Sequence, residues 1–158
     1  MSQARVDAMR IPDRFDIEQL MFLYAKSADL ADIETQSSIF VDDCRVSYSN
    51  GRWFESREEL KAGLRAALTR YAKTSHQVSN IQISFTGVDT ASAESVITAW
   101  HRDVSGKEWT LHGRYVDEWV RAMEGWKLKS RIILAAGATG RDEESLMPLP
   151  RRILSDGD

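Results

Sequence analysis

The second half of the chain alternates apolar and polar residues along four consecutive stretches, and this pattern constrains the fold more than any other feature. The alternation begins at residue 76, where the sequence period changes to two. Turn signals at Gly87–Thr90, Ser105-Gly106 and Met123–Gly125 separate the stretches. Period-two alternation is typical of strands with one buried face, and short turns join antiparallel neighbours. The sequence therefore predicts a strongly bent antiparallel meander of four strands.

The first half of the chain has helical spacing instead. A first helix is predicted from apolar residues three or four positions apart, namely Ile17, Leu20, Met21, Tyr24 and Ala28. Pro12 lies just before these residues, and Asp13 or Asp16 is predicted to cap the helix. Asp32 is predicted to cap a short second helix that extends to about Phe40.

A hairpin and a third helix complete the predicted first half. Cys44–Ser49 and Arg52–Glu55 flank Asn50-Gly51, a dipeptide that favours a tight hairpin turn. Ser56 and Glu59 have the spacing of a capping box. The apolar face of the helix that follows is formed by Leu60, Leu64, Ala67, Leu68 and Tyr71. Three helices on one side of a bent sheet predict an α+β cone with a deep cavity.

Length, charge and cysteine content narrow the class of protein. We expect one domain over residues 1–139 and a polar tail over residues 140–158 that is either disordered or laid on a partner subunit. A formal net charge of -3 argues against nucleic acid as a partner. Cys44 is the single cysteine, which excludes an intrachain disulfide or a thiolate metal site. No membrane span and no apolar signal core are recognised, so a cytoplasmic location is expected.

Five side chains that can move or hold a proton lie where the predicted elements meet. Tyr24 and Asp29 end the first helix, Tyr48 lies on the hairpin, and His76 and His101 lie on the first two strands of the meander. A histidine is the natural base for removing a proton beside a carbonyl, and a carboxylate can orient it. Phenols can donate a hydrogen bond to a developing enolate or a departing hydroxyl. The set predicts an acid/base pocket that needs no cofactor and no metal.

Each of these residues also has a structural interpretation. Tyr24 could belong to the core, Asp29 could cap the next helix, and His76 could bond to backbone at a strand start. His101 could be exposed, because Trp100 competes with it for the inward face. The remaining histidine and the acidic runs are assigned to the outer face or to solvated loops, and they are His112, Asp42-Asp43 and Asp142-Glu143-Glu144.

We expect the cavity to be large and lined with aromatic residues, which suits a flat apolar or aromatic ligand. The predicted substrate contacts are Phe22, Phe40, Trp53, Phe54, Trp100 and Asp103.

The order of elements resembles the nuclear transport factor 2-like superfamily, in its SnoaL-like branch, from about Asp16 to Gly137. The segments that carry the resemblance are Ile17-Glu18-Gln19-Leu20 with Tyr24 and Asp29, Phe40-Val41-Asp42-Asp43, His76-Gln77-Val78-Ser79-Asn80, and Gly125-Trp126-Lys127-Leu128. The proton-handling residues are similar in type and order to those of scytalone dehydratases, although that family has adjacent Tyr and Asp. The Tyr24-to-Asp29 spacing resembles bile-acid 7α-dehydratases, as does Ser47-Tyr48-Ser49-Asn50-Gly51.

The resemblance and the residues together predict a cofactor-independent dehydratase acting on a hydroxylated, carbonyl-bearing cyclic or polycyclic molecule. Two alternatives stay open. One is a steroid-type double-bond isomerase, for which Asp103 or Asp117 would have to point into the cavity. The other is a non-catalytic binding or assembly subunit of the same fold. We also expect a homodimer or homotrimer, in which the outer sheet face buries Trp109, Trp119 and Trp126.

Overall fold

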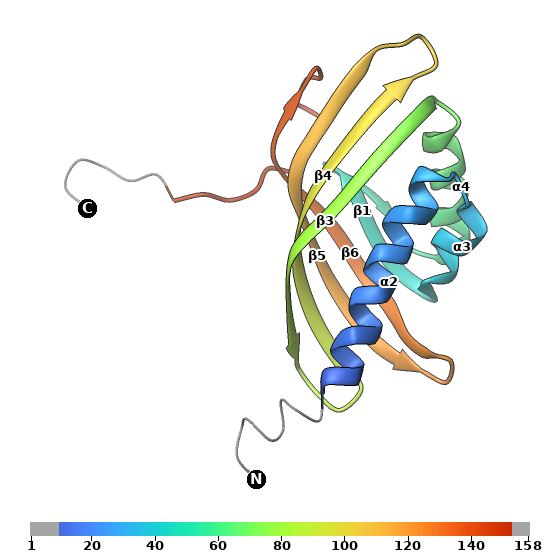
Figure 1. Ribbon diagram of the computed structural model, residues 1–158, viewed down its shortest axis with the longest axis vertical. Coiled ribbons are helices and arrows are strands. Elements are labelled where there is room, and N and C mark those ends of the chain that lie inside the picture. The colour runs from blue at the N-terminus through green and yellow to red at the C-terminus, as the bar shows by residue number, and fades with distance from the viewer. Residues whose placement is uncertain (1–9, 153–158) are drawn as a thin grey trace, which may run out of the picture.

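A computed structural model describes residues 10–152 and shows three helices packed against one curved sheet (Figure 1). The helices are α2 (Ile11–Asp29), α3 (Ile33–Ser38) and α4 (Arg57–Leu68). The strands are β1 (Phe40–Ser49), β2 (Arg52–Phe54), β3 (Tyr71–Phe85), β4 (Thr90–Asp103), β5 (Glu108–Ala122) and β6 (Gly125–Thr139).

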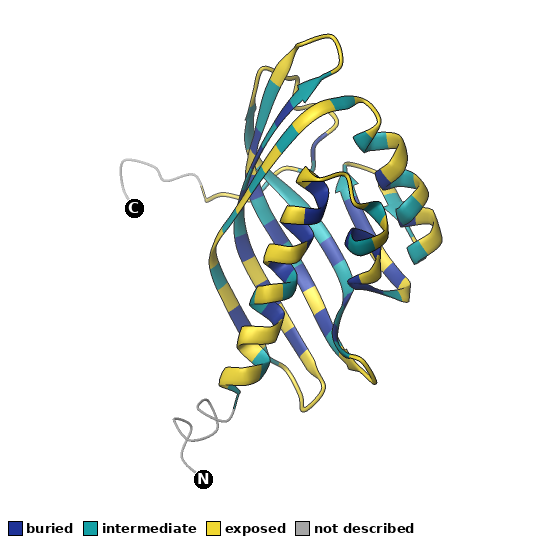
Figure 2. Cartoon of the chain, turned by 45° about the vertical axis from the view of Figure 1, so that its right-hand side comes forward, coloured by how far each residue is buried: buried dark blue, intermediate teal, exposed yellow. Residues whose placement is uncertain are grey.

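The six strands form one open sheet in the order β2-β1-β6-β5-β4-β3. The predicted meander is antiparallel throughout, but β1 pairs with β6 in parallel, so the whole sheet is mixed rather than antiparallel. Helix α2 crosses the concave face diagonally, and α3 and α4 cover the end of that face near β1 (Figure 1). Buried and exposed residues alternate along the strands under α2, as expected for a sheet with one covered face (Figure 2).

The helix starts follow the predicted signals in part. Asp32 accepts a hydrogen bond from the Thr35 N–H at 3.0 Å, and Ser56 accepts one from the Glu59 N–H at 3.2 Å, so both predicted caps are confirmed. The prediction that Asp13 or Asp16 caps α2 is wrong. That helix begins after Arg10, which makes no side-chain cap, and Pro12 lies in its first turn. A proline is tolerated there because the first helical N–H groups have no partner within the helix.

Two predicted element ends also move. Phe40 begins β1 instead of ending the second helix, and Tyr71 begins β3 instead of extending the face of α4. Both residues lie directly beyond a helix end, where an apolar side chain fits the spacing of either neighbour.

A β-bulge in β6 reverses which residues face the core. Glu118 pairs with Ser130 and Trp119 pairs with Leu128, so Lys129 is an extra residue without a register partner. One extra residue changes the face of every later side chain. Before the bulge, the even-numbered Trp126 and Leu128 are buried, whereas beyond it the odd-numbered Arg131 is buried and Ile133 lines the cavity.

The described part of the predicted tail, residues 140–152, lies in part on its own chain. Leu149 and Met147 exchange backbone hydrogen bonds with Ala135, at 2.8 and 2.7 Å, and Ser145 accepts one from the Asn50 N–H at 2.9 Å. Leu146 is buried against the core. This stretch therefore contacts its own chain at Asn50 and Ala135. Residues 153–158, and most of the N-terminal stretch inspected for a signal core, lie outside the described residues.

The tryptophans predicted to cover the outer sheet face point inward. Trp119 and Trp126 are buried in the core, and Trp109 packs at the edge of the cavity. Large exposed apolar side chains lie instead on α2, at Phe15, Phe22 and Leu23, and in loops. None of the described helices is long and apolar enough to cross a membrane.

Candidate active site

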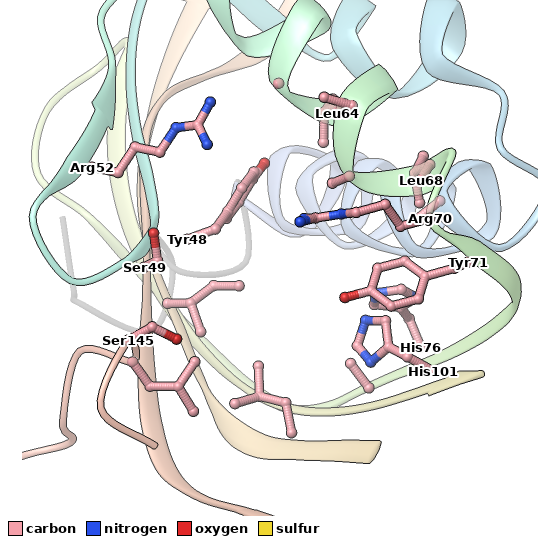
Figure 3. A pocket seen from close by; sticks show the side chains of 18 of the residues that line it. Tyr48, Ser49, Arg52, Leu64, Leu68, Arg70, Tyr71, His76, His101 and Ser145 are labelled. Carbon is pink, nitrogen blue, oxygen red and sulfur yellow. The ribbon is translucent and has the colours of Figure 1, made fainter. Parts of the chain in front are cut away.

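A cavity of about 370 Å³ opens between the C-terminal half of α2, the end of α4 and the inner face of the sheet. Four of the five predicted acid/base residues line it, namely Tyr24, Tyr48, His76 and His101. In Figure 3, Tyr48 and the two histidines lie on different sides of the cavity. Helix, hairpin and meander therefore converge on one site, as the sequence predicts.

The predicted contact between Asp29 and His76 is confirmed. Asp29 is the last residue of α2, and its Oδ1 lies 2.6 Å from Nδ1 of His76. The same carboxylate accepts hydrogen bonds from the His76 backbone N–H at 3.0 Å and from the Thr74 hydroxyl at 2.9 Å. Asp29 thus fixes the imidazole and joins the end of α2 to β3.

The Asp29 carboxyl is held in its charged form. Burial opposes ionisation, but the hydrogen bonds from the His76 ring, the His76 backbone and Thr74 outweigh burial and lower its pKa. An ionised Asp29 places the ring proton of His76 on Nδ1, which leaves Nε2 of His76 free to accept a proton.

His101, the second histidine of the cavity, is neutral and packs against aromatic rings. Burial, and then the nearby His76, lower the pKa of His101 to about 4, so the ring is neutral at neutral pH. Its ring stacks on Trp109 with centroids 4.0 Å apart and meets the His76 ring edge-on at 5.5 Å. Nδ1 of His101 has no hydrogen-bond partner among residues 10–152. The alternation along β4 brings His101 inward with Ala99 and turns Trp100 outward.

The two tyrosines form a pair, with their hydroxyl oxygens 2.7 Å apart. Burial, and then the adjacent Tyr24, raise the pKa of Tyr48 well above its ordinary value, so this phenol keeps its proton. Arg131 lies behind the pair, with its guanidinium carbon 4.3 Å from the centroid of the Tyr24 ring.

Arg131 is itself neutralised beneath the cavity. Asp117 accepts two hydrogen bonds from it, at 2.8 and 2.7 Å, and both side chains are fully buried. Burial works against the charge of Arg131, but the Asp117 carboxylate outweighs burial and raises the pKa of the guanidinium. Both carboxylate oxygens of Asp117 are therefore occupied by Arg131. Asp103 bonds Ser105 and Lys107 in the β4–β5 turn, so neither aspartate is placed as the isomerase alternative requires.

Among the six predicted substrate contacts, Phe54 lines the cavity. Phe40 is buried in the core, Trp53 lies under Arg45, and Trp100 bonds Glu108 on the outer face. Phe22 borders a smaller pocket beside Asp29 and His76, and Asp103 lies in its turn. The prediction that these five line the main cavity is wrong, because aromatic type alone does not determine the face on which a residue lies.

Several lining residues are absent from the predicted site. Tyr71 and Trp109 pack against His101, Arg141 lies over the Trp109 ring, and Arg70 and Arg52 line the cavity elsewhere. Trp109 shares the inward face of β5 with Leu111 and Tyr115, so strand parity could have identified it. Tyr71 faces the cavity together with His76 because the register of β3 shifts between Tyr71 and Lys73, and the alternation alone gives no sign of that shift. The arginines carry no such sequence signal.

The sequence matches the SnoaL-like domain over residues 9–132. The chain belongs to the SnoaL-like domain family. Its fold is that of a solved Novosphingobium aromaticivorans protein provisionally named a scytalone dehydratase, with 30% identity and a TM-score of 0.84 over 97% of this chain and 100% of that one. These matches confirm the predicted superfamily and the α+β cone.

Two more distant structures share the fold. A provisionally named aromatic ring hydroxylase from N. aromaticivorans has 23% identity and a TM-score of 0.79, covering 83% of this chain and 94% of that one. A hexachlorocyclohexane dehydrochlorinase, LinA type 2, has 18% identity and a TM-score of 0.78, covering 90% and 97%. A search of curated proteins found no match.

Proposed function

We propose that this protein is a cofactor-independent dehydratase acting on a hydroxylated cyclic molecule that bears a carbonyl group. The observation that carries the proposal is the 2.6 Å contact between Asp29 and His76 at the wall of a cavity that also holds two phenols. The neighbour named as a scytalone dehydratase supports the same class of reaction.

In the proposed reaction, Nε2 of His76 removes a proton from the carbon beside the substrate carbonyl. Asp29 orients the ring and stabilises the imidazolium that forms. The carbon–hydrogen electrons form a double bond as the carbon–oxygen bond of the hydroxyl group breaks. The departing hydroxide takes the proton from the His76 imidazolium and leaves as water, which returns His76 to its neutral form. Tyr48, with the Tyr24 hydroxyl hydrogen-bonded to it, donates a hydrogen bond to the carbonyl oxygen, and the neutral His101 donates one to the departing oxygen.

The size and lining of the cavity support a cyclic substrate. A volume of about 370 Å³ lies in the range of small-molecule sites. Phe54, Tyr71 and Trp109 offer flat apolar surface, and Tyr71 and Trp109 pack directly against His101. A flat ring system fits beside the acid/base groups on this surface.

Removing the base tests the proposal. His76→Ala should lower turnover of β-hydroxy tetralones about 10²–10⁴-fold, measured as the appearance of the absorbance of the dehydrated product. His112→Ala is the matched control, because His112 is an exposed histidine on β5. An unchanged rate for His76→Ala on a substrate that the wild type turns over, or a strict need for an added metal or nucleotide, would contradict the mechanism.

Two further expectations stay proposals. A homodimer or homotrimer is one, and the exposed Phe15, Phe22 and Leu23 on α2 now support it better than the sheet tryptophans do. Sedimentation that finds a monomer at micromolar concentration would contradict it. A cytoplasmic location is the other.

A further inference from the structure

The cavity is lined by arginine side chains and by no carboxylate. Arg52, Arg70 and Arg141 belong to its wall, and no aspartate or glutamate does so among the described residues. We propose that the substrate carries a carboxylate group in addition to its reacting carbonyl, and that Arg70 and Arg52 bind this carboxylate. This inference deepens the proposed dehydratase function and rests on it for the identity of the site.

The lack of partners sets these two arginines apart. Most other arginines of residues 10–152 form an ion pair, namely Arg10, Arg45, Arg57, Arg65, Arg102, Arg114, Arg121 and Arg131. Arg52 contacts only the ring of Phe54, with 5.0 Å from its guanidinium carbon to the ring centroid, and no acidic side chain. For Arg70, the described contacts include no side-chain hydrogen bond or ion pair.

Their placement suits one shared ligand group. Arg70 follows the end of α4 and extends toward Tyr48 in Figure 3, and Arg52 lies beside Tyr48 at the wall formed by β2. A guanidinium presents paired N–H donors that match the two oxygens of a carboxylate. A carboxylate held near Tyr48 would leave the opposite wall, with His76 and His101, for the reacting carbons.

A structural interpretation of Arg70 is weaker. A cation just beyond the C-terminus of a helix can interact with its last carbonyl groups. The Arg65 and Ala67 carbonyls near that end instead accept hydrogen bonds from the backbone N–H groups of Thr69 and Arg70. The guanidinium of Arg70 makes no such contact, and Arg70 is an exposed residue at the wall of the cavity.

The surroundings favour a carboxylate over a phosphate. The cavity meets the C-terminal turn of α4, through Leu64, Ala67 and Leu68, and that end of a helix carries partial negative charge. Phosphate sites typically use helix N-termini and clusters of backbone N–H donors. The rest of the wall is largely aromatic and aliphatic, which suits the ring body of a carboxylic acid.

A pair of matched ligands tests the inference by binding alone. We would titrate the full-length protein with 2-naphthoate and with the neutral 2-naphthamide, and follow binding by calorimetry. The wild type should bind the carboxylate about tenfold more tightly than the amide, as expected for a charge-assisted hydrogen-bond pair. The double variant Arg70→Gln/Arg52→Gln should lose this preference while binding the amide normally.

Two controls separate this inference from the dehydratase proposal. Arg65→Gln removes the same charge from α4 outside the cavity, so it should keep the preference for the carboxylate. His76→Ala should also keep it, because the carboxylate is held by arginines and not by the base. Equal affinity of the wild type for both ligands, or a preference that survives the double variant, overturns the inference whatever the outcome of the turnover assay.

Discussion

The two ends of helix α2 each carry an aspartate that ties the helix to the sheet, and the two aspartates have different partners. Asp13 accepts hydrogen bonds from Arg121 at 2.6 Å, from Arg10 at 2.8 Å and from the Trp126 ring N–H at 3.1 Å. Asp29 is bound by Thr74 and by a histidine that faces the cavity. The first aspartate is held by permanent donors, and the second by a group that can gain or lose a proton.

We call the part of the molecule around Asp13 and the Arg131–Asp117 pair the packed half, and the part around Asp29 and the cavity the cavity half. In the packed half, which includes Asp13 and the buried Arg131–Asp117 pair, charges are matched by fixed partners, so they serve the fold. In the cavity half, Nδ1 of His101 is buried without a hydrogen-bond partner among residues 10–152, and the exposed Arg70 makes no side-chain ion pair there. Nη1 of Arg131 also lacks a partner, but of these three side chains only His101 and Arg70 line the cavity, where a ligand can bind them.

The largest expected effect is on folding, from Arg131→Met. The substitution leaves the Asp117 carboxylate buried without its partner, which should lower the free energy of unfolding by about 3–5 kcal/mol. Urea denaturation would measure the loss. Because Arg131→Met/Asp117→Leu removes both charges, the double variant should regain most of the stability. A single variant that loses less than about 1 kcal/mol would show that the pair does not hold the packed half together.

Asp29→Asn should act on turnover. The amide cannot stabilise an imidazolium and can favour the wrong tautomer of His76, so kcat on a β-hydroxy tetralone should fall about 10²-fold with a smaller change in KM. The pH profile of kcat should move as well, which a purely structural role would not cause. Asp13→Asn is the matched control on the same helix, and its kcat should equal that of the wild type. Equal losses in both variants would contradict the division into two halves.

Asp13→Asn should act on stability instead. Burial opposes the charge of Asp13, but hydrogen bonds from Arg121, Arg10 and Trp126 outweigh it and lower the pKa to about 2. The Asp13 side chain is only 15% exposed, so solvent screens these bonds little. We expect a loss of about 2 kcal/mol in the free energy of unfolding at neutral pH, from urea denaturation. Because Asp89 shares Arg121 but is far more exposed, Asp89→Asn should cost much less.

The same lowered pKa fixes a pH dependence. A carboxyl whose pKa is lower in the folded than in the unfolded protein stabilises the fold above its unfolded pKa, and this stabilisation is lost as pH falls through the folded value. Thermal unfolding of the wild type should therefore show stability falling between about pH 4 and the Asp13 pKa of about 2. Asp13→Asn should flatten that part of the curve, and a wild-type slope in the variant would assign the effect to other carboxyls.

The packed half was harder to predict from the sequence than the contact at the centre of the site. Asp29 and His76 could be paired because a helix end and a strand of the meander each place one side chain at the same rim. Asp13 has the sequence context of a cap, and only the folded sheet brings Arg121 and Trp126 to it. Arg131 was missed because the bulge at Lys129 reverses the strand alternation, and one sequence gives no sign of an extra residue.

Arg70 shows the same limit in the cavity half. Its neighbour Tyr71 continues the apolar spacing of α4, so the end of the helix could not be placed before Arg70 from periodicity. A basic residue after a helix is also common for electrostatic reasons. The general order of helices and strands follows from patterning, whereas the cavity-lining charges depend on where each element ends.

The smallest expected effect comes from Tyr24→Phe, at the boundary between the two halves. The ring stays packed against Phe40 and Tyr115, and the lost hydroxyl removes one hydrogen bond of 2.7 Å to Tyr48, so stability should fall by only about 1 kcal/mol. Turnover should also change little, because the pair shares one hydrogen bond and Tyr48 can still donate its own proton to a ligand.

Tyr48→Phe removes the phenol whose hydroxyl is seen at the cavity in Figure 3, and should therefore reduce turnover more than Tyr24→Phe does. Urea denaturation and the tetralone assay on both variants measure this difference. If Tyr24→Phe lowered turnover more than Tyr48→Phe, Tyr24 would be the direct donor to the ligand and would belong to the cavity half.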